Sequence, residues 1–364
     1  MGDDRGADAL ARNEAPAPDA FSPPVLDAFQ AISFSKLVHG IVHTQLVFVA
    51  ARLRLADHLV AGLQTAADLA AATGTIEARL YRILRALASI GLVSETQPGC
   101  FVLTQLGTAL RSDIPESQRD FAIMMGSPWH VAGWGNILHA LQHEQSGFDG
   151  AFGMGLFDYL EVHPEESTHF SNAMTYTSRR HVDAILRAYD FAAGSVVVDV
   201  GGGHGLLLRA ILKRDEGSRG ILFDAPSVVS GAAGEIEADG LAARCERIGG
   251  SFFEAVPSGG DVYLLKYIIH DWDDAAAITI LENCRKAMKP GARLLIIDVV
   301  VPVQNAPFAK VWSDIEMMVL LPNGKERTES EFLTLLSDAG LKIARIIPTR
   351  SQLSIIEAVP SLET

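Results

Sequence analysis

The sequence predicts an α/β fold in which a doubly wound, mostly parallel sheet of seven strands follows an all-helical, winged-helix N-terminal domain. From Ala193 onward, short apolar strands alternate with helical stretches, a pattern typical of parallel strands joined by right-handed crossovers. The first of these strands runs into a glycine-rich turn and then a helix. The 364 residues are 48% hydrophobic and 20% charged, which suits about two globular domains.

Four segments divide the chain. We expect residues 1–24, which are acidic and rich in Ala and Pro, to form a disordered tail. Residues 25–113 are expected to form the winged helix, residues 114–190 a helical segment around a pocket, and residues 191–364 the sheet domain. Neither a secretory signal nor a membrane span is visible. Three cysteines that lie far apart exclude a disulfide framework, so we expect a cytoplasmic protein.

The winged helix is predicted from its caps and turns. Thr65 is suited to cap a first helix, which Gly74 ends. The apolar residues of the stretch 80–87 repeat at helical spacing and form one face of a second helix, which a further glycine ends. Two short strands, 92–94 and 101–103, flank a Pro-Gly turn and form the wing.

A winged helix raises the question of DNA binding, and a transcription regulator with a small-molecule sensor domain is one alternative function. Residues 41–111 hold six Arg and no Lys against four acidic residues, and the chain carries a net charge of −14. A DNA-binding protein usually has a stronger basic surface, so nucleic acid is not an expected partner. The stretch 32–60 is apolar on too many sides for a solvated helix. We therefore predict a homodimer formed through residues 28–63.

Met and aromatic side chains are frequent in the segment 114–190. Most are expected in a core, but such side chains also suit the wall of a pocket for a flat, apolar ligand. Met125 and Trp129 are candidates for this wall. The strands that follow are predicted at residues 196–200, 220–224, 244–248, 261–266, 292–299, 342–347 and 353–359.

The turn after the first strand indicates a nucleoside cofactor. Gly201 and Gly203 let the backbone turn tightly and approach a ligand closely. A leucine stands where the dinucleotide pattern needs its third small residue, which argues against a nicotinamide enzyme. Asp224, at the end of the second strand, is placed to accept hydrogen bonds from both hydroxyls of a ribose. Phe252 follows the third strand and can cover an adenine face.

His270 is the candidate general base, because it follows the fourth strand and lies among acidic residues. Its neighbour Asp271 is a candidate substrate ligand. No metal is implied. His39, His43, His139 and His143 form pairs at helical spacing, but no third ligand stands at a recognisable distance from them.

Four motifs carry a resemblance that covers nearly the whole chain after the tail. They read DVGGGHG, FDAPSVV, LLKYIIHDWDD and NGKERTESEF. The chain resembles the S-adenosylmethionine-dependent O-methyltransferases of the plant caffeate/isoflavone type and their bacterial relatives, the hydroxyneurosporene, polyketide and phenazine O-methyltransferases. The resemblance implies a Rossmann-like methyltransferase domain, S-adenosylmethionine as cofactor and an N-terminal winged helix that serves dimerisation.

The same resemblance assigns roles to individual residues. It makes His270 the general base on the substrate hydroxyl, held by Asp298 and Glu326. Plant members carry Glu where this chain has Asp298, whose arm is one methylene shorter. The remaining implied contacts are Ser251 and Lys266 with the cofactor adenosine, and Phe170, Met174, Tyr267 and Asn323 with the substrate.

The implied reaction is methyl transfer from S-adenosylmethionine to a hydroxyl, and most readily a phenolic one, of a small aromatic or secondary-metabolite acceptor. The imidazole activates the oxygen, and alignment of oxygen, methyl and sulfur supplies much of the remaining acceleration. A second alternative is a relative that keeps the cofactor pocket but performs hydroxylation, decarboxylation or a pericyclic reaction. The set of His270, Asp298 and Glu326 argues against it.

Overall fold

The computed structural model describes residues 28–304 and 308–361, in two parts that we take one at a time, residues 28–43 and residues 44–361. The predicted tail, residues 1–24, lies outside the described residues. In the first part, α1 (Ala28–Val38) is followed by the start of α2 (Gly40–Arg52). Five large apolar side chains of this part are between 49% and 78% exposed: Phe34, Leu37, Val38, Ile41 and Val42. These helices therefore present an apolar surface.

The winged helix forms within the second part, as the sequence predicts. Its helices after α2 are α3 (Leu55–Val60), α4 (Ala66–Thr73) and α5 (Glu77–Ser89), and its wing pairs β1 (Val93–Gln97) with β2 (Cys100–Leu103). The Thr65 hydroxyl accepts a hydrogen bond from the backbone N–H of Asp68, and Gly74 ends α4 with a left-handed φ of 65°. The first wing strand runs three residues beyond its predicted end, into the turn.

The short helix η1 (Gly107–Leu110) follows the wing. Helices alone make up the regular structure of residues 114–190. They are α6 (Arg119–Gly126), α7 (Pro128–Gly135), α8 (Ile137–Gln142), α9 (Gly147–Phe152), α10 (Leu156–Val162) and α11 (Pro164–Ala188). Trp129, Phe148 and Leu160 are buried in the core of this segment.

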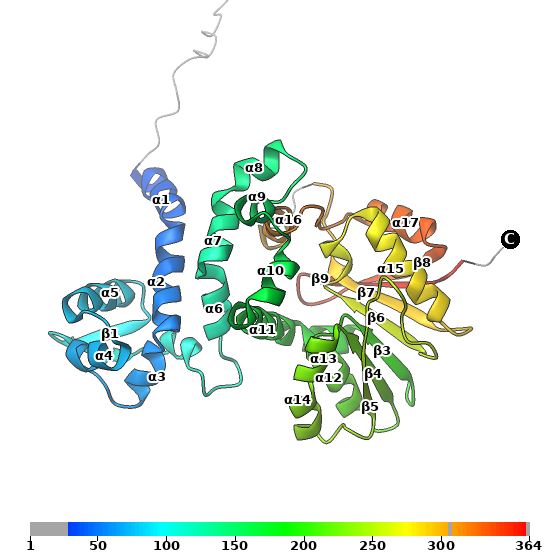
Figure 1. The fold of residues 1–364 in the computed structure, drawn as a ribbon, viewed down its shortest axis with the longest axis horizontal. Helices are drawn as coiled ribbons and strands as arrows, with labels where there is room; N and C mark the ends of the chain where they lie inside the picture. The colour runs from blue at the N-terminus through cyan, green and yellow to red at the C-terminus, as the bar shows by residue number, and fades with distance from the viewer. Residues whose placement is uncertain (1–27, 305–307, 362–364) are drawn as a thin grey trace, which may run out of the picture. The chain divides into compact units, whose positions relative to one another are not determined.

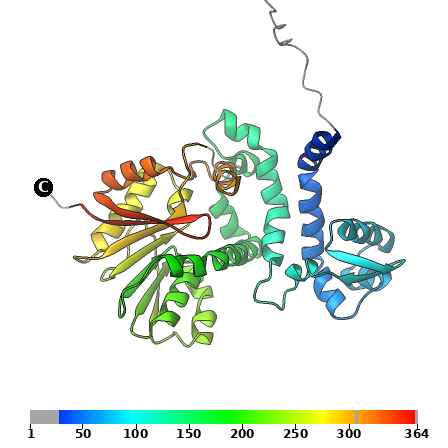
Figure 2. The ribbon, with the colours of Figure 1, turned by 180° about the vertical axis from the view of Figure 1, so that it is seen from behind.

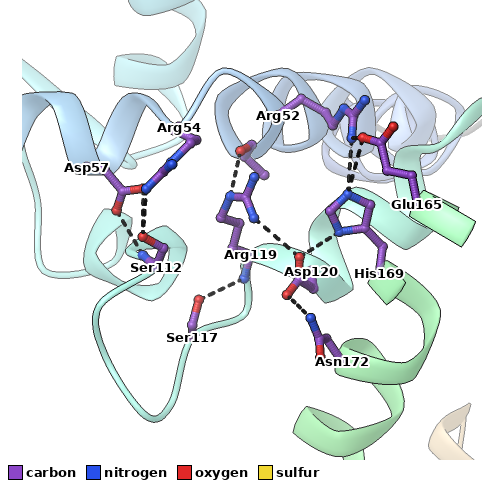
Figure 3. A network of polar contacts seen from close by, with 11 residues as sticks. Arg52, Arg54, Asp57, Ser112, Ser117, Arg119, Asp120, Glu165, His169 and Asn172 are labelled. Atoms are coloured by element: carbon purple, nitrogen blue, oxygen red, sulfur yellow. Dashed lines mark hydrogen bonds and ion pairs between the residues drawn. The ribbon is translucent and has the colours of Figure 1, made fainter. Parts of the chain in front are cut away.

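A polar network ties the winged helix to the middle segment (Figure 3). Arg52, at the end of α2, donates to Glu165 at 2.6 Å and lies 3.1 Å from Nε2 of His169 on α11. His169 in turn contacts Asp120 of α6 through Nδ1 at 2.7 Å, and Asn172 donates to the second oxygen of Asp120 at 2.9 Å. These contacts fix the start of α11, which continues toward the sheet.

The sheet has seven strands in the order β5-β4-β3-β6-β7-β9-β8. Their bounds are β3 (Val196–Val200), β4 (Arg219–Asp224), β5 (Cys245–Gly249), β6 (Val262–Lys266), β7 (Arg293–Val299), β8 (Leu341–Pro348) and β9 (Leu353–Pro360). The first five are parallel neighbours, and β9 pairs antiparallel with both β7 and β8. Each strand begins and ends within one residue of its predicted position.

Successive strand residues face opposite sides of the sheet, because side chains alternate along a strand. Val197 and Leu264 pack on one side with α11, α12 (Leu206–Arg214), α13 (Pro226–Gly231) and α14 (Ala233–Ala238). Val198 and Leu265 pack on the other with α15 (Asp274–Ala287) and α17 (Glu329–Asp338). Figures 1 and 2 show these two helical layers around a doubly wound sheet.

Two connections depart from simple alternation of strands and helices. No helix separates β5 from β6, where residues 250–261 form a loop at the carboxyl end of β5. The helix α16 (Phe308–Leu320) follows β7 but packs against α7, α8 and α9 of the middle segment (Figure 1). Among the described residues, no helix is long and apolar enough to cross a membrane.

Candidate active site

The candidate site lies at the carboxyl ends of the parallel strands, where open α/β sheets bind their ligands. The glycine-rich loop follows β3, Asp224 ends β4, Lys266 ends β6, and Asp298 is the penultimate residue of β7. Because these strands are neighbours in the sheet, the predicted cofactor and catalytic residues come from one edge.

The glycine-rich loop presents bare backbone to this edge. Gly201 and Gly203 have left-handed φ angles of 69° and 57°, which L side chains rarely adopt. A Cβ on Gly201 would lie 2.4 Å from Ile268, whereas a Cβ on Gly203 would meet no atom within 4 Å. The loop is therefore packed on its inner side and open beside Gly203.

Asp224 is held next to that open position. Its two carboxylate oxygens accept from the backbone N–H of Gly203 at 2.8 Å and of Ala225 at 2.7 Å. Burial raises the pKa of Asp224, against the lowering effect of these two bonds. A carboxylate oxygen can accept more than one hydrogen bond, so both oxygens can also receive the two hydroxyls of a ribose.

An aromatic side chain lies on the other side of the loop. The Phe252 ring approaches within 3.6 Å of where a Cβ on Gly201 would be, and it packs edge-on against Trp272 with 6.0 Å between ring centres. The neighbouring Ser251 hydroxyl accepts from the backbone N–H of Phe253 at 3.3 Å. These groups fit the adenosine of S-adenosylmethionine. The Asp224 carboxylate suits the ribose diol, the Phe252 ring suits an adenine face, and the Ser251 hydroxyl suits an adenine nitrogen.

Lys266 is a half-buried cation between the cofactor and catalytic halves of the site. Its ammonium donates to the Ser178 hydroxyl of α11 at 2.7 Å. Burial lowers the pKa of Lys266 to about 8, although Asp199 and Asp298 oppose the shift. Burial also raises the pKa of Asp199, at the end of β3, to about 7.

Three carboxyl groups surround the imidazole of His270, which lies in the short helix η2 (Ile269–Asp271). Its Nδ1 lies 3.1 Å from Oε1 of Glu326 and 3.9 Å from Oδ1 of Asp298. Its Nε2 lies 3.4 Å from Oδ1 of Asp271. His270 is 8% exposed, and Asp298 and Glu326 are 0% and 5% exposed. The structure thus brings the predicted catalytic residues together.

These charges decide the protonation of the site. Burial lowers the pKa of His270, but Asp298, Glu326 and Asp271 outweigh it and raise the pKa to about 10. Burial raises the pKa of Asp298 to about 7 and that of Asp271 to about 6, although the imidazolium opposes both shifts. At neutral pH the imidazole therefore holds its proton, and once deprotonated it is a stronger base than an ordinary histidine.

Glu326 is the carboxylate that orients the ring. The Ser313 hydroxyl of α16 donates to its Oε1, and its backbone N–H donates to Asp314 at 2.9 Å. The backbone N–H of Lys325 donates to the carbonyl of His270 at 2.9 Å. The turn that carries Glu326 is thus bonded both to α16 and to the backbone of His270.

Asp298 interacts with His270 by charge and without a hydrogen bond. Its 3.9 Å separation from Nδ1 is too long for one. Neither of its oxygens has a hydrogen-bond partner among the described residues. An aspartate side chain is one methylene shorter than that of glutamate, which limits its reach from β7 toward Nδ1.

The expected substrate residues are more dispersed. Met125, Phe170 and Met174 are half-buried around the core of the middle segment, while Trp129 is buried and donates its indole N–H to Glu166 at 3.0 Å. Asn323 is exposed, with its amide 3.4 Å from Asp273.

Tyr267 lies against the base, since its ring stacks on the imidazole of His270 at 5.2 Å. Sequence reasoning missed several residues that contact the site. They are Ser178, His181, Trp272, Ser313 and Gln352. Only Trp272 had a local signal, because it follows His270 and Asp271 in one motif.

Two family models match the chain. Residues 134–342 match the O-methyltransferase domain and residues 35–113 match the O-methyltransferase dimerisation domain. The phenazine O-methyltransferase PhzM of Lysobacter antibioticus is 42% identical over 325 residues, which are 89% of this chain and 95% of that protein. The chain belongs to the O-methyltransferase family. It is an S-adenosylmethionine-dependent O-methyltransferase, and neither alternative function is favoured.

Solved structures share the fold of this O-methyltransferase. The crystal structure of LaPhzM has a TM-score of 0.87 at 41% identity, with 91% of this chain and 99% of that chain covered. NcsB1, an O-methyltransferase from neocarzinostatin biosynthesis, has a TM-score of 0.78 at 32% identity, with 89% and 98% covered. Its crystal structure is a complex with S-adenosylmethionine and 2-hydroxy-5-methyl naphthoic acid.

Some relatives have names that give nitrogen, and not oxygen, as the acceptor atom. The phenazine-1-carboxylate N-methyltransferase of Pseudomonas aeruginosa is 32% identical, with 89% of this chain and 95% of that protein covered. The acceptor of this enzyme therefore has to be argued from its own site.

Proposed function

We propose that the enzyme methylates a phenolic hydroxyl of a small, flat aromatic acceptor, with His270 as general base. The observation that carries the proposal is the set of three carboxyl groups around one buried imidazole. They raise the pKa of His270 to about 10, close to the value of an ordinary phenol. Proton transfer from a phenol to the neutral imidazole is then nearly balanced, which suits general base catalysis.

The bound cofactor supplies an electrophilic methyl group on a positively charged sulfur. The residues that we propose to hold its adenosine are Gly201, Gly203, Asp224, Ser251, Phe252 and Lys266. Asp224 binds the ribose hydroxyls, and the Phe252 ring covers the adenine. The Gly203 backbone lies beside Asp224 and lets the cofactor approach closely, because no side chain stands there.

His270 acts on the acceptor oxygen through Nε2. Glu326 accepts from Nδ1–H, which keeps the Nε2 lone pair free in the neutral imidazole. When Nε2 takes the hydroxyl proton, the resulting imidazolium is stabilised by Glu326 and Asp298. Asp271 lies on the Nε2 side of the ring, at 3.4 Å, and we propose that it contacts the acceptor as well.

A strong base favours oxygen over nitrogen as the acceptor atom. A phenol is a weak nucleophile until it loses its proton, whereas a neutral amine already offers a lone pair. A site that surrounds its histidine with three carboxyl groups is therefore suited to hydroxyl chemistry.

The acceptor pocket is proposed to lie between the middle segment and the catalytic loop. Met125, Trp129, Phe170 and Met174 belong to one cluster of the middle segment. Phe170 meets Phe157 edge-on, and Phe157 stacks on Trp272 with 6.1 Å between ring centres. This aromatic chain extends to the loop that carries His270, and soft, flat side chains of this kind favour an aromatic acceptor. An aromatic acceptor also agrees with the naphthoic acid in the NcsB1 complex.

The assembly that we propose is a homodimer formed through residues 28–63. Its support is the match to a dimerisation domain together with the exposed apolar side chains of residues 34–42. Light scattering at micromolar concentration reads the oligomeric state directly. We propose a cytoplasmic location on the ground that all three cysteines are free thiols.

The proposed function is tested with His270→Ala, S-adenosylmethionine and a panel of phenols, with products followed by mass spectrometry. We expect cofactor affinity to persist and methyl transfer at pH 7 to fall by about 10² to 10⁴. The deficit shrinks once the pH exceeds the pKa of the phenol, because the phenolate then forms without a base. Wild-type turnover of the variant at pH 7 would overturn the role of His270.

A further inference from the structure

Tyr267 has an unusual backbone for its side chain. Its φ is 57°, and Arg54 is the only other non-glycine residue with a positive φ in the described part of the chain. A left-handed backbone is rare for a bulky side chain and indicates that the surroundings hold it there. The residue directly follows β6, and its N–H still donates to the carbonyl of Ile297 on β7 at 3.2 Å. The chain therefore turns sharply at the last point of the ladder.

This turn places the tyrosine ring on the imidazole of the base. The two rings lie 5.2 Å apart between centres and are within 25° of parallel. The Lys266 ammonium lies over the tyrosine ring at 4.5 Å from its centre. The ring is therefore fixed between the preceding side chain and the histidine three residues later.

The hydroxyl of Tyr267 is anchored from a distant part of the sheet. Gln352, just before β9, donates from Nε2 to this hydroxyl at 3.2 Å. The turn that carries Gln352 is itself bonded, because Ser351 donates its N–H to the Thr349 hydroxyl at 3.1 Å. The position of the tyrosine thus depends on the β8–β9 turn.

The imidazole needs a second constraint besides Glu326. A hydrogen bond at Nδ1 fixes one point of the ring but leaves the ring free to tilt about that bond. Asp298 supplies no second hydrogen bond, since it lies 3.9 Å away. Stacking on Tyr267 restricts this tilt, because it fixes the plane of the imidazole.

We propose that Tyr267 is a positioning residue for the base, anchored by Gln352. The stacked ring holds the imidazole so that Nδ1 meets Glu326 and Nε2 points to the acceptor oxygen. This role rests on the proposed function of His270, and it differs from the substrate contact that the family resemblance implies for Tyr267.

The main test replaces the ring with Tyr267→Leu in the full-length enzyme. We expect kcat to fall about 10- to 100-fold, while KM for the cofactor and for a phenol changes less than about threefold. The loss should shrink at high pH, where the phenolate forms without the base. The matched control is Tyr189→Leu, which removes a buried tyrosine that also has a cation over its ring, Arg345 at 5.5 Å, and should keep kcat.

A second pair of variants tests the anchor and retains the ring. Tyr267→Phe and Gln352→Met remove opposite ends of one hydrogen bond, so each should lower kcat by about two- to fivefold. The double variant should be no worse than either single one, because both lose the same contact. An additive loss would show that the two residues act separately and would remove Gln352 from the proposal.

The outcomes separate this inference from the function on which it rests. A Tyr267→Leu enzyme with raised KM and unchanged kcat and pH profile would make Tyr267 a binding residue and overturn the proposal. If His270→Ala is inactive while Tyr267→Leu keeps wild-type kcat, only the positioning role fails. Wild-type turnover of His270→Ala overturns both. Calorimetric titration with S-adenosylmethionine checks that each variant is folded.

Discussion

Two histidines flank the same tyrosine ring but exist in opposite charge states. His270 stacks on Tyr267, whereas His181 of α11 meets the ring edge-on at 6.1 Å. Burial lowers the pKa of both imidazoles. For His181, the cations Lys266 and Arg180 add to this effect, and the pKa is about 4. For His270 the three carboxyl groups reverse it, and the pKa is about 10.

Because burial acts on both imidazoles in the same direction, the neighbouring charges decide the difference between them. His181 is neutral at physiological pH, and its Nδ1 has no hydrogen-bond partner in the part of the chain that the structure describes. The charged groups that shift its pKa, Lys266 and Arg180, are both cations. His270 has acids on both ring nitrogens, so it can hold a proton taken from a substrate.

The largest effect is expected when the orienting carboxylate is removed. Glu326→Gln should lower kcat roughly 10²-fold, because an amide can donate to Nδ1 and turn the wrong nitrogen toward the acceptor. The measurement is steady-state methyl transfer to a phenol at pH 7 to 8. Glu357→Gln is the control, since Glu357 is also buried but contacts Arg293 and Arg345 away from the site. Equal losses in both variants would mean that Glu326 only supports the fold.

The next largest effect is a shift of the pH profile when Asp298 is changed. The base works only when it is deprotonated, so kcat/KM should rise with pH toward the pKa of His270. Asp298→Asn removes a negative charge that favours the imidazolium, and the rise should move to lower pH by about one unit. Asp298→Glu should keep the wild-type profile or move it upward, because the longer arm can reach Nδ1. An unmoved profile in Asp298→Asn would show that Asp298 does not tune the base.

The sequence predicted the sheet well because its signals are local. Runs of Val, Ile and Leu bounded by glycine mark strands, and all seven were located within one residue. The catalytic residues were named through motifs shared with a known family. Motifs specify residue types, but they do not give distances. The 3.9 Å separation of Asp298 from Nδ1 depends on where β7 lies beside η2.

Two of the unpredicted residues reach the site from far along the chain. Gln352 reaches Tyr267 across 85 positions, and Ser178 reaches Lys266 across 88. Such contacts arise only when the sheet is assembled, and no local sequence pattern predicts them. The sequence also does not predict the left-handed backbone of Tyr267, because tyrosine normally avoids this conformation.

The smallest effect is expected at His181, and it concerns stability on the acid side. Its pKa of about 4 in the folded enzyme is below the ordinary 6.5, so the unfolded chain binds the proton more tightly. Stability is therefore lost as the pH falls from about 6.5 to about 4. His181→Phe removes this group. Between pH 6.5 and pH 4, the melting temperature of the variant should therefore fall by a few degrees less than that of the wild type. His270→Phe is the contrast, because the raised pKa of His270 favours the folded state below pH 6.5 and this contribution fades as the pH rises toward 10. If the melting temperatures of His181→Phe and the wild type changed equally between pH 4 and pH 6.5, the cations beside Tyr267 would not hold His181 neutral.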